Sequence, residues 1–179
     1  ELTLHENCLM IADAQKATAL AGIMGGLNSG IKDDTQDIFI EAAYFNPPTV
    51  NKTVKKFAVS SDSSQRFERG TDIEAVTLAL QRATDLFLQL CGGTASEIAD
   101  VYPTRYESPT VTFTPAEINT ILGAQIPHER LQEIFSRLAA EFHADGDVWT
   151  FKAPPHRRDL NHKWDLAEEA ARFAGYDMI

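Results

Sequence analysis

The chain has 179 residues, with 16 Lys and Arg against 26 Asp and Glu, which gives a formal net charge of −10. Hydrophobic residues make up 44% and charged residues 23%, a balance typical of folded, soluble proteins rather than disordered ones. No apolar run approaches the roughly 20 residues that a membrane-spanning helix needs. Residues 1–109 carry a net charge of −6 and residues 110–179 one of −4. Neither half therefore predicts a broad nucleic-acid-binding face, because affinity for phosphate comes mainly from clustered Lys and Arg.

The length is that of one large or two small domains. The sequence starts without Met and ends without a polar tail, so we expect a piece of a longer protein. Cys8 and Cys91 stand alone, without metal-ligand spacing or a disulfide framework, which favours a reducing cytoplasm. Residues 102–109 contain two prolines and are the predicted linker. We therefore expect one domain over residues 1–105 and a second over residues 110–179.

The first domain is predicted to begin with short strands, at residues 8–12 and 17–21, followed by a glycine-rich turn. Residues 38–43 are almost entirely apolar and predict a buried strand that contains one carboxylate, Glu41. A helix over residues 47–57 is expected next, with Asn46 as its cap and proline in its first turn.

A longer helix is indicated by apolar residues that recur at steps of three and four between residues 73 and 90. Thr71 and Glu74 have the spacing of a capping box, which predicts that this helix starts just after Thr71. Gly92 is expected to end it.

The second domain is predicted to mix short helices with a hairpin. A strand at residues 111–113 leads to Thr114 and Glu117, which have capping-box spacing before a helix that Gly123 stops. Further expected elements are a helix around residues 131–138, a hairpin at Asp145–Gly146, and a last helix that Asn161 caps and that ends before Gly175. The predicted fold class is α+β: a β-rich first domain with flanking helices, and a second domain similar to a winged helix.

Glu41 is the first candidate for chemistry, because a carboxylate in an apolar run is unfavourable unless it has a partner. It either accepts a hydrogen bond from a ligand hydroxyl or amine, or lies at a strand edge in water or against an Arg. The glycine-rich segment, residues 22–26, either lines a pocket with backbone N–H groups or forms a plain turn. It lacks the Lys and the hydroxyl residue that end a phosphate-binding loop.

Four carboxylates, those of Asp159, Asp165, Glu168 and Glu169, lie near the start of the last predicted helix. If they converge, they suit a hard cation such as Mg²⁺. Alternatively they decorate a helix N-terminus, where the helix dipole favours negative charge. Arg157 either grips a phosphate or a carboxylate, together with Arg158, or belongs to an ordinary surface pair.

The ordered set of motifs resembles the β subunit of bacterial phenylalanyl-tRNA synthetases over nearly the whole chain. The resemblance rests on residues 22–26, 29–31, 41–47, 60–61 and 66–70, followed by 121–123, Pro154, Arg157, Asp159, Asp165–Leu166, Glu168–Glu169 and 175–177. Residues 1–105 are similar to the later part of the family's editing domain, and residues 110–179 to the small module that follows it.

The resemblance implies a parent enzyme that attaches phenylalanine to tRNA(Phe) with ATP and Mg²⁺, as a cytoplasmic α2β2 assembly. ATP would be used by the parent, whose synthetic site lies in the α subunit, and not bound by this fragment. The editing domain of the family hydrolyses tyrosine wrongly attached to that tRNA. By the resemblance, Glu41 accepts the tyrosine hydroxyl, while Ala21, Gly22, Gly25 and Gly26 line the pocket. Water attacks the ester, so no catalytic side chain is assigned.

The resemblance also associates Asp159, Asp165, Glu168 and Glu169 with a Mg²⁺ site shared with the α subunit. We expect the fragment by itself to bind Mg²⁺ weakly and to be nearly inactive in editing. The alternative is a scaffold that holds the α subunit and orients tRNA without a catalytic role. Arg66 and Arg69 either contact tRNA or pair with Glu68 and Asp72. No membrane partner is expected.

Overall fold

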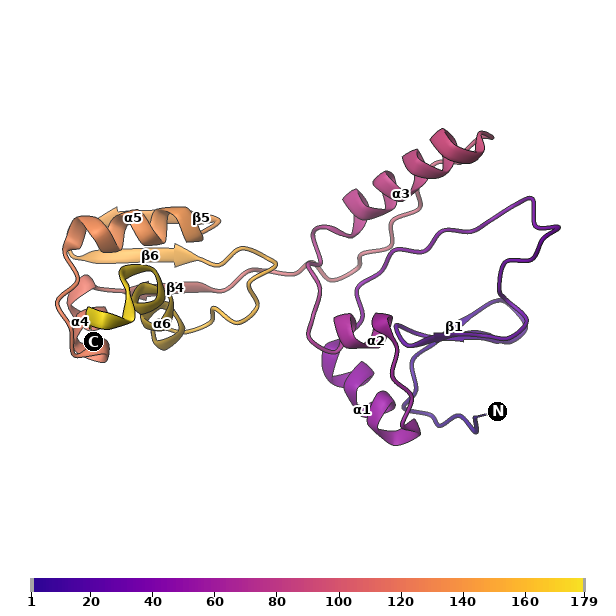
Figure 1. Ribbon diagram of the computed structural model, residues 1–179, viewed down its shortest axis with the longest axis horizontal. Coiled ribbons are helices and arrows are strands. Elements are labelled where there is room, and N and C mark those ends of the chain that lie inside the picture. The colour runs from indigo at the N-terminus through magenta and orange to yellow at the C-terminus, as the bar shows by residue number, and fades with distance from the viewer. Residues whose placement is uncertain (1, 179) are drawn as a thin grey trace. The chain divides into compact units, whose positions relative to one another are not determined.

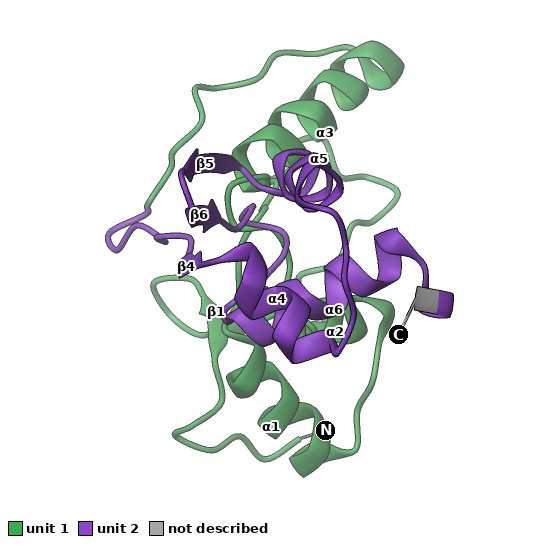
Figure 2. Cartoon of the chain, turned by 90° about the vertical axis from the view of Figure 1, so that its left-hand side faces the viewer, with its two compact units in different colours: residues 1–101 green, residues 102–179 purple. Residues whose placement is uncertain are grey.

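The computed structural model describes residues 2–178. They contain two small antiparallel sheets and a set of helices, joined by irregular segments (Figure 1). The predicted α+β class is confirmed. Packing divides the chain into two units, residues 1–101 and 102–179, which are coloured separately in Figure 2. Within the described residues, no helix combines the length and the apolar character needed to cross a membrane.

Unit 1 opens with a three-stranded antiparallel sheet in the order β1-β2-β3. Its strands are β1 (Met10–Ala12), β2 (Ala17–Leu20) and β3 (Met24–Gly25). Two helices follow, α1 (Pro47–Phe57) and α2 (Asp62–Phe67). A small core joins the sheet to these helices, and its buried residues are Leu20, Ala21, Ile23, Phe45 and Val50.

The start of α1 follows the prediction. The side chain of Asn46 accepts a hydrogen bond from the backbone N–H of Thr49, and prolines occupy the first turn, where their missing N–H groups cost nothing. The helix ends at Phe57, as expected. Helix α2 was not predicted from the sequence. Ser61 caps it in a capping box with Ser64.

Helix α3 (Val76–Cys91) is present but begins later than predicted. The expected capping box is wrong, because the backbone N–H of Glu74 bonds to the side chain of Asp72 and the helix starts only after Ala75. Gly92 ends the helix, as predicted. None of its residues is buried, and on its apolar face Phe87 is 46% and Leu90 78% exposed, so the later part of that face is exposed within the described chain.

The strand predicted for residues 38–43 is wrong in this structure: the segment is irregular and pairs with no described strand. Phe39 is 95% exposed and Glu41 is exposed as well. A strand needs hydrogen bonds from a neighbouring strand, and an apolar sequence does not supply them.

Unit 2 packs three helices with an antiparallel sheet in the order β4-β6-β5. The strands are β4 (Thr110–Phe113), β5 (Glu141–Asp145) and β6 (Val148–Lys152). The helices are α4 (Pro115–Leu122), α5 (His128–Leu138) and α6 (Lys163–Ala174), and a 3₁₀ turn, η1 (Tyr176–Met178), follows. Its core centres on Trp149, Phe113, Phe135 and Phe151, each at most 2% exposed.

The local signals in unit 2 are mostly confirmed. Thr114 and Glu117 form the predicted capping box of α4, and Gly123 ends that helix with a φ of 64°. The hairpin forms at Asp145, which pairs with Val148 across the turn. The predicted cap of α6 is wrong by one residue, since His162 and not Asn161 is the N-cap.

Candidate functional site

A hollow of unit 1 has a volume of about 570 Å³ and lies where the glycine turn, the segment before α1, helix α2 and the start of α3 meet. Apolar side chains form most of its wall, and polar groups lie at a few points. Its lining consists of Gly22, Glu41, Ala42, Ala43, Phe45, Ser63, Phe67, Thr71, Asp72, Ala75, Val76 and Ala79.

Gly22 is required at this hollow for two reasons. Its φ of +69° is a conformation that favours glycine, and a Cβ there would lie 2.8 Å from a ring carbon of Phe45. The rings of Phe45 and Phe67 pack edge to face, with their centres 4.9 Å apart. The glycine turn and these two rings therefore form one closely packed wall of the hollow.

Hydrogen bonds from the start of α2 hold the glycine turn in place. The hydroxyl of Ser61 donates to the carbonyl of Ile23 at 2.6 Å, and that of Ser63 donates to the carbonyl of Gly22 at 3.1 Å. The same Ser61 oxygen accepts from the backbone N–H of Ser64. Ser61 thus caps a helix and fixes the position of the turn.

We expect Ser61→Ala to lower the free energy of unfolding of unit 1 by about 1–2 kcal/mol, because it removes a helix cap and a bond to the turn. Urea unfolding followed by circular dichroism measures this. Ser60→Ala is the matched control, since Ser60 is exposed just before the cap. Equal effects of the two substitutions would contradict the role given to Ser61.

The hollow brings together two of the five predicted pocket residues, Glu41 and Gly22. The other three do not line it. Ala21 is buried in the core, Gly25 is exposed on β3, and Gly26 lies against the backbone of Thr18. The pocket assignment of these three residues stays a prediction. Glu41 stands in the lining but is exposed, so its carboxylate is not desolvated in this chain.

Sequence reasoning did not single out Thr71 and Asp72 as pocket residues, although both line the hollow. The capping-box spacing of Thr71 and Glu74 predicted a helix start at this place instead. The side-chain oxygen of Thr71 is buried without a hydrogen-bond partner among the described residues. Two alanines at i,i+4 spacing, Ala75 and Ala79, line the same hollow. That small-residue spacing was the one signal that the pattern offered.

Arg66, whose role was left open, donates from its guanidinium to the backbone carbonyl of Asp62. Glu68, one of its expected partners, accepts from the amide of Asn51 instead. These bonds tie α2 to itself and to α1.

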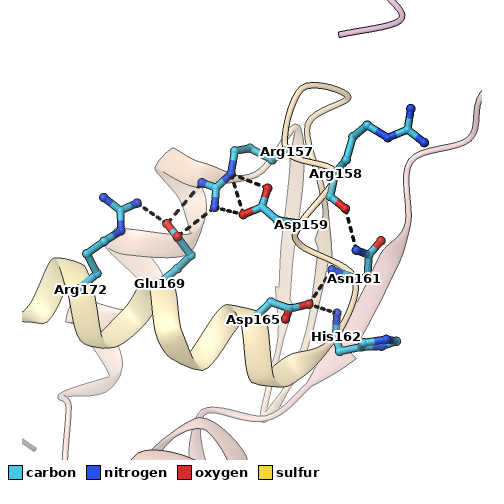
Figure 3. Close-up of polar contacts among 8 residues, drawn as sticks. All are labelled: Arg157, Arg158, Asp159, Asn161, His162, Asp165, Glu169 and Arg172. Carbon is cyan, nitrogen blue, oxygen red and sulfur yellow. Dashed lines mark hydrogen bonds and ion pairs between the residues drawn. The ribbon is translucent and has the colours of Figure 1, made fainter. Parts of the chain in front are cut away.

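A second cluster lies in unit 2, where the loop before α6 meets that helix (Figure 3). The guanidinium of Arg157 lies between the carboxylates of Asp159 and Glu169 (Figure 3). Its Nη2 is 2.6 Å from Asp159 Oδ2 and 2.9 Å from Glu169 Oε1, and its Nε is 3.0 Å from Asp159 Oδ1. Arg172 bonds to the other oxygen of Glu169.

The charges of this cluster support one another. Hydrogen bonds from Arg157 hold the pKa of Asp159 below its ordinary value. Burial pushes the pKa of Glu169 upward, but hydrogen bonds from Arg157 and Arg172 outweigh it and leave that pKa lowered. Hydrogen bonds to Asp159, which have the larger effect, and to Glu169 raise the pKa of Arg157. The group therefore stays fully ionised at neutral pH.

The other two predicted metal ligands are placed differently. One carboxylate oxygen of Asp165 accepts hydrogen bonds from the backbone N–H groups of Asn161 and His162, at 2.8 Å each. Asp165 thereby caps the N-terminus of α6. Glu168 is exposed on the same helix. Among residues 2–178, no three His, Cys, Asp or Glu side chains are grouped so as to hold a metal ion. Carboxylates suit Mg²⁺ chemically, but this arrangement, filled by Arg157, does not fit it.

Comparison with protein-family models separates the chain into two parts that correspond to units 1 and 2. Residues 1–92 match the B3/4 domain model, and residues 111–176 match that of the tRNA synthetase B5 domain. The chain belongs to the B3/4 domain family, and its second half is similar to the B5 domain.

Two relatives extend the match over the whole chain. The phenylalanine–tRNA ligase β subunit of Coxiella burnetii is 37% identical over 100% of this chain and 23% of its own length. That of Geobacter sulfurreducens is 41% identical over 99% of this chain and 22% of its own length. The resemblance to these β subunits is confirmed, and the chain spans less than a quarter of their length.

Proposed function

We propose that this chain forms part of the β subunit of a phenylalanine–tRNA ligase and contributes to a pocket that hydrolyses tyrosyl-tRNA(Phe). The observation that carries the editing role is the hollow of unit 1, in which Glu41 faces the same space as the packed rings of Phe45 and Phe67. An aromatic side chain of a substrate fits against an apolar wall, and a carboxylate accepts a phenolic hydroxyl.

A second site of this kind has a clear physical purpose. An apolar pocket rejects an added hydroxyl only about 100-fold, so a synthetic site selects weakly against tyrosine. An editing pocket that requires the hydroxyl selects in the opposite sense, because phenylalanine would leave the carboxylate of Glu41 unpaired. This mismatch costs about 1–3 kcal/mol once the carboxylate is desolvated. Since Glu41 is exposed in this chain, desolvation would come from the rest of the subunit or from the tRNA.

The hydrolytic step needs no nucleophilic side chain. Water would attack the ester, while the substrate and backbone groups of the glycine turn orient it. The chain accounts for 23% of the C. burnetii relative, so we expect the isolated fragment to release tyrosine only slowly. Rapid deacylation by the isolated chain would contradict this.

The editing role is tested in the complete ligase that contains this segment. Glu41→Ala should lower the rate of tyrosyl-tRNA(Phe) deacylation about tenfold or more, the equivalent of losing about 1.4 kcal/mol, and leave phenylalanine charging intact. Asp37→Ala is the matched control, because Asp37 is an exposed carboxylate of the same segment outside the hollow. Unchanged hydrolysis would reduce Glu41 to a structural carboxylate and favour a scaffold.

A scaffold role for unit 2 is the second proposal. Its core is complete, yet three aromatic residues near its C-terminus remain outside it: Trp164 is 60% exposed, Phe173 41% and Tyr176 62%. Such side chains suit a protein partner, which here would be the α subunit. Loss of α-subunit association in Glu168→Ala/Glu169→Ala, with editing intact, would support it. Retained association would contradict it.

The remaining assignments belong to the complete enzyme. It would act in the cytoplasm, use ATP and Mg²⁺, carry its synthetic site in the α subunit of an α2β2 assembly, and take tRNA(Phe) as substrate. These assignments follow from the family resemblance; the names of the relatives give only a phenylalanine–tRNA ligase β subunit.

A further inference from the structure

Two neighbouring residues of the hollow in unit 1, Thr71 and Asp72, have hydrogen-bonding capacity that the proposed function leaves unused. The hydroxyl oxygen of Thr71 is buried and has no hydrogen-bond partner among the described residues. A buried hydroxyl without a partner is unfavourable, because it has lost its bonds to water and gained none. The loop before α3 therefore offers the hollow a polar group whose partner has yet to arrive.

The carboxylate of Asp72 is also only partly used. Its Oδ1 accepts a hydrogen bond from the backbone N–H of Glu74 at 3.0 Å, which closes the turn before α3. Within residues 2–178, no arginine or lysine pairs with Asp72, although Arg69 lies three residues before it. Its second oxygen is thus available to a ligand in the hollow.

The charge of the hollow favours a positively charged ligand group. Two carboxylates, Glu41 and Asp72, belong to its wall, and none of the described residues that form this wall is Lys, Arg or His. A concave, mainly apolar surface that carries charges of one sign concentrates their field and attracts the opposite charge. The hydroxyl of Ser63 already donates to the carbonyl of Gly22, so it does not change this balance.

The two carboxylates differ in the ligand groups that they suit. An ammonium group has three N–H donors and needs several acceptors close together, whereas a phenol has a single donor. Thr71 and Asp72 are adjacent in the chain and supply two acceptor groups in one place. The threonine hydroxyl can turn to a ligand by rotation between staggered positions. Glu41 has no such neighbour in the segment before α1, where the other lining residues are apolar.

We propose that Asp72, assisted by the hydroxyl of Thr71, binds the α-ammonium group of the aminoacyl ester, while Glu41 accepts the phenolic hydroxyl. The inference rests on the proposed editing function and adds a second point of recognition to it. Two contacts from different segments hold the substrate at both ends of its amino acid, which fixes the position of the ester between them.

The test compares two esters of tRNA(Phe) in the complete ligase: the tyrosyl ester, and its analogue in which a hydroxyl replaces the α-ammonium group. Asp72→Asn should lower kcat/KM for deacylation of the tyrosyl ester at least about tenfold, the effect of losing a hydrogen bond to a charged group. It should change that of the hydroxy analogue less than about twofold, because this ester has no ammonium group to lose.

Asn at position 72 keeps an oxygen that can accept from the N–H of Glu74, so the turn before α3 should survive the substitution. Asp37→Asn is the matched control, since Asp37 is exposed and outside the hollow, and it should leave both rates unchanged. Equal losses with the two esters would show that Asp72 acts only on the structure and would overturn the inference. Unchanged deacylation of the tyrosyl ester by Asp72→Asn would overturn it as well.

Thr71→Val provides the second variant if Asp72→Asn unfolds. Valine has the shape of threonine without the hydroxyl, and this hydroxyl has no described partner, so the variant should melt at the wild-type temperature or above it. Its deacylation of the tyrosyl ester should nevertheless fall about threefold or more, with the hydroxy analogue unaffected. A stable Thr71→Val ligase with full activity toward the tyrosyl ester would contradict the role of the hydroxyl.

The same pair of esters separates this inference from the function on which it rests. Glu41→Ala should lose activity toward both esters alike, because both carry the phenolic hydroxyl. Loss in Glu41→Ala without an ester-dependent loss in Asp72→Asn would therefore retain the editing function and refute the ammonium contact. A wild-type ligase that leaves tyrosyl-tRNA(Phe) intact would refute both.

Discussion

Trp149→Ala should lower the free energy of unfolding of unit 2 by about 3–5 kcal/mol, the range found for removal of a large aromatic side chain from a core. Trp149 is 0% exposed and packs edge to face against Phe113, Phe135 and Phe142, with ring centres 5.4–6.3 Å away. Its indole nitrogen has no hydrogen-bond partner among the described residues, so its contribution comes from packing. Urea unfolding followed by circular dichroism measures the loss.

Trp164→Ala is the matched control, because Trp164 is 60% exposed at the start of α6. Its effect should stay within about 0.5 kcal/mol. Trp149→Phe should fall between the two, since it retains an aromatic ring but leaves a cavity. A Trp149→Ala variant as stable as Trp164→Ala would show that Trp149 does not anchor the core of unit 2.

Gly26→Ala should disrupt the sheet of unit 1. A Cβ on Gly26 would lie 2.2 Å from the backbone oxygen of Thr18, a contact that only a backbone shift relieves. Ser29 reinforces the close approach, because its hydroxyl bonds to the carbonyls of both Thr18 and Gly26. Overpacking costs about 1–3 kcal/mol, and a rigid backbone partner places this site at the upper end.

The neighbouring glycine is the control. A Cβ on Gly25 would meet nothing within 4 Å, so Gly25→Ala should leave the sheet intact. Amide hydrogen exchange of β2 and β3 distinguishes the variants: Gly26→Ala should lose protection there, and Gly25→Ala should keep it. Similar exchange in both would contradict the close approach.

These two glycines show the limit of sequence reasoning at the candidate pocket. The cluster of glycines predicted a pocket lining or a turn, and the structure contains a positive φ at Gly22 and a close backbone approach at Gly26. Nothing in the pattern distinguished Gly26 from Gly25. The difference comes from Thr18 on the neighbouring strand, and strand pairing is a contact between distant parts of the chain.

The same limit explains the pocket and the acidic cluster. Glu41 lines the hollow, but its predicted burial rested on apolar neighbours, of which Ile38 and Phe39 are exposed. The sequence left two interpretations of Arg157 open. Its partners are the carboxylates of Asp159 and Glu169, two and twelve residues further along the chain. Spacing alone does not tell whether a carboxylate meets a metal ion or an arginine.

The sequence by itself determined the features that depend on neighbouring residues: the cap of α1 at Asn46, the capping box of α4, the glycine end of α3 and the hairpin at Asp145. Each is stabilised by bonds within a few residues, so the pattern contains the whole cause. Tertiary structure alone decided that residues 38–43 form no strand, that α3 buries none of its residues, and that Arg157 lies between Asp159 and Glu169. Burial and charge pairing depend on which distant segments meet, and local periodicity does not specify that.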